Sequence, residues 1–414
     1  MLSNIASVTS LKYRLILCAL IVMTFLGYVF SYLGFARPRG FKGDFYAAMY
    51  DPKWWNGEGV FYGPIFVLER WFVNSFPTIA TVHFFAVGCL FFIFVSLVIT
   101  LNIIQTNRYL TVYCLITWVL NTFFYYSFSV AANPELLELF LLLIMWWCFA
   151  KKRFALGSVA FTCAVLTKLS PVIFLPILLL FFSWTSAIIS VGLFIGIVLA
   201  VSIGQNQSFF ASISQMLDVE TAGLQPASKQ FLGLSSGLAR LLGMQPDENF
   251  KYVILLASVL ICFLFTISVV ISVKIYRSYQ IPNYNVKVAY IFALFLTLLP
   301  FFHFSQTHRH TYLFLAPVFV TLKFISISDY DIARGLHYSR LTDLLFLIYA
   351  FLPLYFLDFF NIKLLSGVSF GNDFGMSLAM LSEPVWTNLA LLVLILVYGL
   401  GLSRKRTILI EEKG

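Results

Sequence analysis

Residues 252–273 read YVILLASVLICFLFTISVVISV, an uncharged run that lies between Lys251 and Lys274. A helix needs about 20 apolar residues to cross the hydrocarbon core of a bilayer, so this run predicts a transmembrane helix. About twelve such runs occupy most of the chain. The sequence therefore predicts an all-α integral membrane protein with about 12 transmembrane helices. The runs are 15–35, 78–101, 109–131, 134–150, 154–167, 171–183, 185–204, 251–273, 287–302, 311–325, 341–358 and 384–402.

The composition excludes a soluble globular protein. Of the 414 residues, 60% are hydrophobic and 11% are charged, whereas soluble domains carry about 25% charged residues. The net charge is +9, but the basic residues lie mostly at the ends of apolar runs, where anionic lipid headgroups account for them. We therefore expect membrane lipids as partners and no nucleic acid. The six cysteines lie inside apolar runs without a C-x-x-C pair, which indicates packing residues.

The basic residues also predict the orientation of the chain. With the N-terminus in the cytoplasm, 16 of the 27 Lys and Arg residues fall in inner segments, as the positive-inside rule expects. Five of the others crowd between Arg37 and Arg70. The chain is then a single domain over 1–414 with both termini cytoplasmic. Its long segments, at about 36–77, 205–250 and 359–383, lie outside, so we expect an extracytoplasmic active site.

The first outer segment mixes carboxylates, cations and aromatic residues. A carboxylate at the mouth of a membrane cavity can act as general base for an incoming hydroxyl. The other interpretation is an interfacial loop in which Trp54 and Trp55 anchor the chain at the headgroups. The residues alone do not rank the four acids. The acids and tyrosines follow in the order Asp44, Tyr46, Asp51, Glu58, Tyr62 and Glu69.

Acidic residues also open one of the predicted spans. Asn133-Pro134-Glu135 precedes the run that ends at 150, and Glu138 lies one helical turn further in. A carboxylate within a membrane is costly to bury and marks a functional candidate. The alternative for Glu135 is a helix N-terminus, with Asn133 as the cap and the carboxylate favoured by the helix dipole.

The sequence Thr167-Lys168-Leu169-Ser170-Pro171 separates two short apolar runs. We expect two half-depth helices to meet there inside the membrane. Irregular backbone at that depth survives only where protein or a water-filled cavity surrounds it. Lys168 could then meet a lipid phosphate as a point charge. The alternative is a cation that snorkels to the headgroups.

The outer segment 303–310 gathers three of the five histidines, and it ends in His308-Arg309-His310. Imidazolium and guanidinium groups could neutralise a phosphate leaving group. A metal site is a second interpretation, although no other His or Cys cluster would complete it. A solvated interfacial loop is a third.

The second long outer segment contributes Gln230 and Arg240, in a stretch that predicts a short amphipathic helix over a cavity or a plain surface helix. Several catalytic signatures do not occur in the sequence: a Walker A loop, a Rossmann glycine fingerprint, G-x-S-x-G and H-E-x-x-H. ATP-driven transport, dehydrogenation and serine or zinc hydrolysis therefore have no support.

The order of these motifs resembles that of the multi-spanning GT-C glycosyltransferases. The most similar family is glycosyltransferase family 87, the polyprenyl-phosphomannose-dependent mannosyltransferases. Gly63 and Lys229 depart from the family's pattern. The similar segments span about 40–325 in the family's order. They are Gly43-Asp44-Phe-Tyr46, Tyr62-Gly-Pro64, Ala132-Asn133-Pro134-Glu135, Thr167-Lys168-Leu-Ser-Pro171, Ser228-Lys229-Gln230-Phe231…Arg240 and His310-Thr-Tyr312.

The resemblance implies an inverting transferase in a bacterial cytoplasmic membrane, with a GT-C-like bundle and short amphipathic helices in its outer loops. One sugar, mannose or another hexose or pentose, would move from a polyprenyl-phosphate donor to a lipid-linked or glycolipid acceptor. Asp44 would be the catalytic base, and no metal or other cofactor is expected. The alternatives are a lipid or lipid-linked-sugar transporter and a polysaccharide polymerase or ligase. Substrate would be bound by Tyr46, Glu58, Tyr62, Glu135, Lys168, Gln230, Arg240, His308, Arg309 and His310.

Overall fold

The computed structural model describes most of the predicted spans. It covers residues 78–104, 108–120, 135–181, 184–222, 250–278, 283–302, 308–329, 331–356 and 384–404, and a few isolated positions outside these ranges. Every element within them is helical, as predicted, and they contain no strand. The chain divides into two compact units, Met1–Thr221 and Ala222–Gly414. The prediction of a single functional domain over 1–414 stays a prediction.

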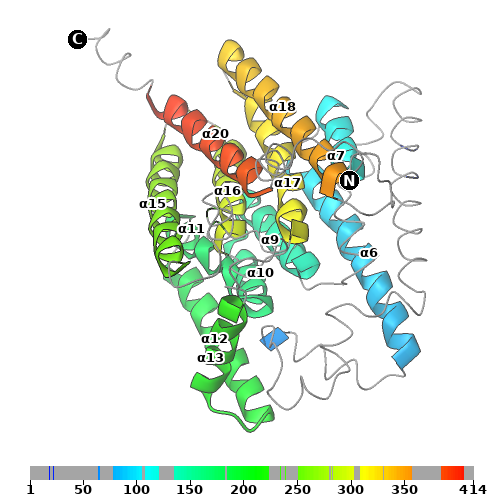
Figure 1. Ribbon diagram of the computed structural model, residues 1–414, viewed down its shortest axis with the longest axis vertical. Coiled ribbons are helices and arrows are strands. Elements are labelled where there is room, and N and C mark those ends of the chain that lie inside the picture. The colour runs from blue at the N-terminus through cyan, green and yellow to red at the C-terminus, as the bar shows by residue number, and fades with distance from the viewer. Residues whose placement is uncertain are drawn as a thin grey trace. The chain divides into compact units, whose positions relative to one another are not determined.

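Most helices of the first unit follow predicted apolar runs (Figure 1), and α13 is the exception because it lies in the predicted outer segment 205–250. Apolar runs predict helix bounds well here because the charged and polar residues that end them also end the helices. The helices are α6 (Thr78–Ile103), α7 (Arg108–Leu120), α9 (Glu135–Ala150), α10 (Phe154–Thr167), η2 (Ser170–Phe174), α11 (Leu175–Phe181), α12 (Trp184–Gly204) and α13 (Phe209–Ala222).

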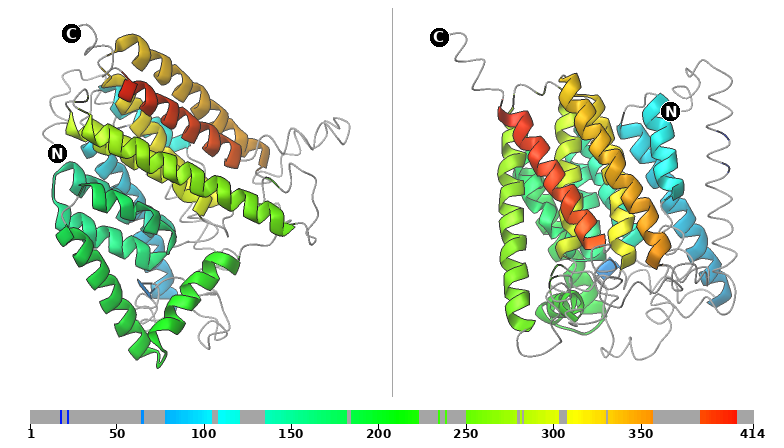
Figure 2. Two further views of the ribbon diagram at one scale, coloured as in Figure 1. Left: turned by 90° about the vertical axis from the view of Figure 1, so that its left-hand side faces the viewer. Right: turned by 45° about the horizontal axis from the view of Figure 1, so that its top comes forward.

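In the second unit the buried helix α16 packs against α15, α17 and α20, and α18 packs against α17 and α20 (Figure 2). Most side chains of α16 are buried, so this helix is apolar on all sides, as a central helix must be. The helices are α15 (Phe250–Arg277), α16 (Tyr284–Phe302), α17 (His308–Ile327), α18 (Ile332–Phe356) and α20 (Pro384–Arg404).

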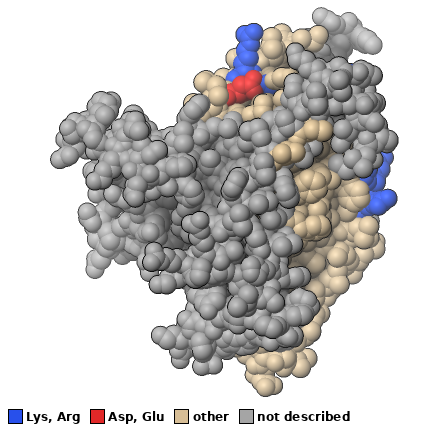
Figure 3. Space-filling view, turned by 90° about the vertical axis from the view of Figure 1, so that its right-hand side faces the viewer, with Lys and Arg blue, Asp and Glu red and all other residues tan. Residues whose placement is uncertain are grey.

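Three described helices are long and apolar enough to cross a membrane: Trp184–Gly204, Tyr252–Arg277 and Tyr284–Phe302. Large apolar side chains such as Ile203 and Phe263 are more than half exposed on the first two. The described surface in Figure 3 is mainly uncharged, with its Lys, Arg, Asp and Glu side chains at the margins. Extended apolar surface of this kind marks a membrane or protein contact. The predicted total of about 12 spans includes runs outside the described residues and stays a prediction.

Helices α9 and α10 form a tight hairpin. Lys152 adopts a positive φ of 57°, and the N–H of Arg153 donates to the Cys148 carbonyl at 2.8 Å, which is the Schellman ending of a helix. Gly157 then packs directly against the Phe149 ring, and a Cβ at this position would overlap the ring. The short basic turn thus fixes how closely the two helices approach.

Small hydroxyl residues hold α10 against α12. Thr162 Oγ1 donates to the Ser190 carbonyl, and Ser190 Oγ donates to the Ser158 carbonyl, both at 3.4 Å. Small residues allow helix backbones to approach closely and are enriched where helices pack in membranes. The face of α12 that carries Ser186 and Ser190 is therefore its inner face.

A sharp corner joins α12 to α13. Asn206 has a φ of 55°, and the Gln207 N–H donates to the Ser202 carbonyl at 2.9 Å. Ser208 Oγ caps α13 by accepting from the Ala211 N–H at 3.1 Å. The predicted outer segment 205–250 therefore begins with a short helix. We predicted a helix further along, around Gln230 and Arg240, and both residues lie outside the described residues.

Candidate functional site

The structure describes the predicted site residues unevenly. Four of them begin helices, where the backbone is described: Glu135 is the first residue of α9, and His308, Arg309 and His310 are the first three of α17. Lys168 is described in full. Asp44, Tyr46, Glu58, Tyr62, Gln230 and Arg240 lie outside the described residues.

Helix α17 begins at His308, inside the predicted outer segment 303–310, whose place outside the membrane stays a prediction. We placed the helix start at residue 311, where the apolar run begins. The N–H groups of a first helical turn have no partner within the helix, so polar residues are readily accommodated there. The first turn of α17 therefore consists of two histidines and an arginine followed by a threonine, and a helix N-terminus attracts anions.

The predicted break at Lys168 is confirmed. Helix α10 ends at Thr167, and Lys168 takes an extended conformation with φ −152° and ψ 142°. Its own N–H still donates to the Ala164 carbonyl at 3.1 Å. The 3-10 helix η2 then starts at Ser170, with Pro171 in its first turn. Proline has no N–H, and its ring would clash with the carbonyl four residues earlier, that of Thr167, so a continuous α-helix cannot run through this point.

The break is lined by polar side chains that are almost completely buried. Lys168 and Ser170 are each 5% exposed, and Glu138 of α9 is 0% exposed. Ser170 Oγ donates to Glu138 Oε1 at 3.2 Å. A cation, a carboxylate and a hydroxyl are thus enclosed where two helices of the first unit meet. We call Lys168, Ser170 and Glu138 the break site.

The break site encloses charged groups, which cost several kcal/mol per ion to bury unless partners compensate. Buried charges of this kind mark candidates for a functional site. A lysine ammonium is a compact point charge that suits phosphate oxygens. Glu138 was a secondary candidate from sequence, because its spacing from Glu135 places it one turn into the span.

Replacement of Ser170 by alanine is expected to destabilise the first unit by about 1.5–3 kcal/mol, the typical loss for a hydrogen bond to a charged group. The change leaves Glu138 Oε1 without this donor in a buried place. Unfolding in detergent, followed by tryptophan fluorescence, measures the loss. Thr167→Val is the matched control, because among the described residues that hydroxyl bonds to the Cys163 carbonyl of its own helix and to no other group, and we expect no comparable effect. Equal losses would contradict a specific role for Ser170.

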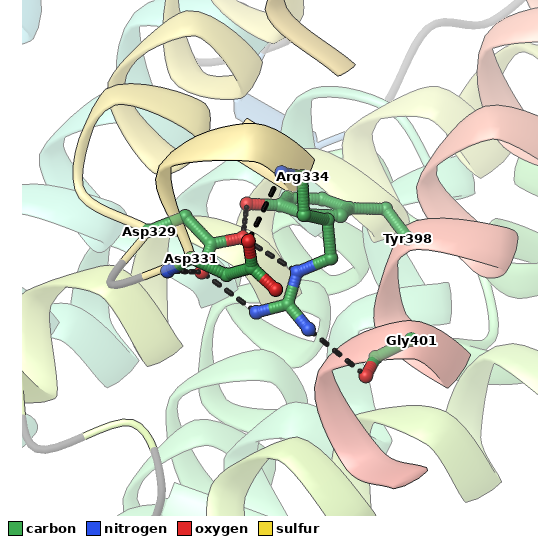
Figure 4. A network of polar contacts seen from close by, with 5 residues as sticks. All are labelled: Asp329, Asp331, Arg334, Tyr398 and Gly401. Atoms are coloured by element: carbon green, nitrogen blue, oxygen red, sulfur yellow. Dashed lines mark hydrogen bonds and ion pairs between the residues drawn. The ribbon is translucent and has the colours of Figure 1, made fainter. Parts of the chain in front are cut away.

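A second buried polar cluster holds the second unit together (Figure 4). The Asp329 carboxylate accepts from Arg334 Nε and Nη2 at 2.8 and 2.6 Å and from the Tyr398 hydroxyl at 2.8 Å. Arg334 Nη1 donates to the Gly401 carbonyl at 3.1 Å. Asp331 accepts from the Arg334 N–H at 3.2 Å and caps α18. The cluster thereby ties the α17–α18 connection to the last turns of α20.

The Asp329 cluster predicts a pH dependence. Burial acts to raise the pKa of Asp329, but hydrogen bonds from Arg334, the Asp331 N–H and Tyr398, with the Arg334 charge, hold that pKa below its usual value. The lowered pKa of Asp329 stabilises the folded protein at pH values above the carboxyl pKa of the unfolded chain, about 3.9. This stabilisation is lost as the pH falls through the lower pKa that Asp329 has in the folded protein.

We therefore expect the wild-type protein to melt at a higher temperature than Asp329→Asn at pH 6. The difference should shrink as the pH is lowered from about 5 to 3. Differential scanning fluorimetry in detergent measures both melting temperatures over this range. A difference that stays constant down to pH 3 would contradict the assignment.

One more ion pair links α17 to α18. Lys323 Nζ donates to both carboxylate oxygens of Asp343, at 2.8 and 2.6 Å, and to Ser339 Oγ. Lys323 is 2% exposed, whereas the Asp343 side chain is 41% exposed. Sequence reasoning missed this pair, although a signal existed: each residue is an isolated charge in one of two consecutive apolar runs, and the charges are opposite.

Comparison with known protein families, curated proteins and solved structures finds no match to this chain. The resemblance to family 87 therefore rests on the order of the sequence motifs. Among the described residues, no three His, Cys, Asp or Glu side chains come together as a metal site. The absence of a metal from the reaction stays a prediction.

Proposed function

We propose that this chain is an inverting glycosyltransferase that moves a single sugar from a polyprenyl-phosphate donor to a lipid-linked or glycolipid acceptor on the extracytoplasmic side. The observation that carries the proposal is the break site. A buried lysine at the end of α10, which packs on the membrane-length helix α12, suits the phosphate of a lipid whose chain lies in the bilayer.

The proposed reaction needs three kinds of group. A base takes the proton of the acceptor hydroxyl as its oxygen attacks carbon 1 of the sugar, and Asp44 is proposed for this. The bond from carbon 1 to the phosphate oxygen breaks through an oxocarbenium-like transition state. The phosphate leaves with the electron pair and needs cations, for which we propose Lys168, Arg240 and the histidines at the start of α17.

The test is a transfer assay with a panel of synthetic polyprenyl-phosphate sugars. Membranes that contain the chain are compared with membranes that lack it, and radiolabel in the acceptor fraction is measured for mannose, other hexoses and pentoses. We expect transfer from one donor above the background. A chain that transfers no sugar from any donor, but moves labelled lipid across vesicle membranes, would be a transporter. Transfer of whole glycans alone would indicate a polymerase or ligase.

A further inference from the structure

Several cations meet at one end of the second unit. The Lys287 ammonium on α16 donates to the Tyr276 carbonyl near the end of α15, at 3.1 Å, so the end of α15 lies beside the start of α16. Lys274 and Arg277, in the last turn of α15, are exposed. The stretch 274–287 contains no Asp or Glu. We call Lys274, Arg277 and Lys287 the basic end.

The described acids at this end of the second unit, Asp329 and Asp331, are already engaged. The Arg334 guanidinium binds Gly401 near the end of α20, and Gly335 packs on the Ser326 carbonyl near the end of α17. Gly399 of α20 in turn lies against Ile271 of α15 and Tyr290 of α16, so the α17–α18 connection lies at the same end as the basic end. Its Asp329 is paired with Arg334, and its Asp331 caps α18. The positive charge of Lys274 and Arg277 is thus not neutralised by an ion pair within the described structure.

The exposed face of α15 leads straight to these cations. Leu256, Val259, Phe263 and Val270 are between 48% and 59% exposed, and they recur every three or four residues except for one skipped turn. Residues at this spacing lie along one face of a helix. Lys274 and Arg277 continue the same face. One side of α15 therefore changes from apolar to cationic within a single helical turn.

The basic end is held in place rather than carried on a loose loop. The Lys287 bond fixes the end of α15 to α16. Asn283 Oδ1 accepts from the Asn285 N–H at 3.0 Å and shapes the start of α16, and Ile281 is buried. A helix end that is fixed in this way loses less backbone conformational entropy on binding a ligand than a free loop does.

We propose that the basic end of the second unit docks anionic phospholipids of the surrounding bilayer. The headgroup phosphate lies against Lys274 and Arg277, and an acyl chain follows the apolar face of α15. A phospholipid combines an apolar chain and an anionic head in the order that this face presents. The docking is independent of any transferase activity.

The test is a lipid titration of the full chain in detergent by native mass spectrometry. Phosphatidylglycerol is compared with phosphatidylcholine, which has the same phosphate but no net charge. A basic side chain near an anionic membrane surface contributes about 1 kcal/mol. The double variant Lys274→Ala/Arg277→Ala is therefore expected to weaken phosphatidylglycerol binding by about 30-fold and to leave phosphatidylcholine binding unchanged.

The matched control is Lys151→Ala/Lys152→Ala, which removes two exposed cations from the α9–α10 turn of the first unit. We expect this control to retain most of the preference for phosphatidylglycerol. Lys274→Arg should keep the wild-type affinity. Equal weakening by both double variants would overturn the proposal, because net charge would then explain the binding. Equal affinity of the wild-type protein for the two lipids would also overturn the proposal. Displacement of phosphatidylglycerol by millimolar inorganic phosphate would overturn it as well.

Discussion

Transfer from the preferred polyprenyl-phosphate donor is expected to fall by about 10²- to 10⁴-fold in Asp44→Asn, the usual contribution of a general base. Asparagine preserves the size of the side chain but cannot take a proton from the acceptor hydroxyl. Binding of the donor should change little, because the proposed phosphate contacts lie elsewhere. Initial rates of radiolabel transfer at saturating donor measure the loss.

The controls are Asp51→Asn and Glu58→Gln, which remove carboxylates from the same outer segment. Each should lower transfer much less than Asp44→Asn if Asp44 is the base. Protein amount and melting temperature must match the wild type for the comparison to hold. A wild-type rate in Asp44→Asn, with a collapse in either control, would move the role of base to that residue.

Replacement of Arg334 by alanine is expected to destabilise the protein by about 3–5 kcal/mol, the usual cost of breaking a buried ion pair from one side. The Asp329 side chain is 0% exposed and would lose its charged partner. The Gly401 carbonyl would lose a donor as well. Reversible unfolding in mixed detergent micelles, monitored by circular dichroism, gives the free energy difference.

Arg340→Ala provides the matched control for Arg334, because Arg340 is exposed on the same helix. Its effect should stay within about 0.5 kcal/mol. The double variant Asp329→Asn/Arg334→Met removes both charges and should be more stable than Arg334→Ala. A double variant less stable than the single one would show that the ion pair is not the source of the loss.

Much of the helical architecture could be predicted from the apolar runs. The predicted runs 154–167 and 185–204 nearly coincide with α10 and α12. The break at Lys168 was predictable because Pro171 and a charged residue interrupt an apolar stretch, and both oppose a continuous membrane helix. The local rules of helix breaking need no knowledge of the rest of the chain.

The pairing of the helices was not predictable in the same way. Ser170 bonds to Glu138 across 32 positions, and Tyr290 donates to the Ile395 carbonyl across 105 positions. A helix such as α16 is apolar on all sides, so its sequence does not indicate which face meets which neighbour. The Asp329 cluster was missed because Asp329 bonds to Tyr398, which lies 69 positions away on another helix.

The contact between α16 and α20 has a consequence for biosynthesis. Tyr290 bonds to Ile395 and Asn388 bonds to Thr297. A step of seven residues forward along α16 therefore corresponds to a step of seven residues backward along α20, so the two helices run in opposite directions. The first of these bonds joins residues 105 positions apart. At a translation rate of about 5–20 residues per second, α20 follows α16 by roughly 5–20 s. During that interval α16 must stay in the membrane or the insertion machinery without its last neighbour, so the second unit closes only as the final helix arrives.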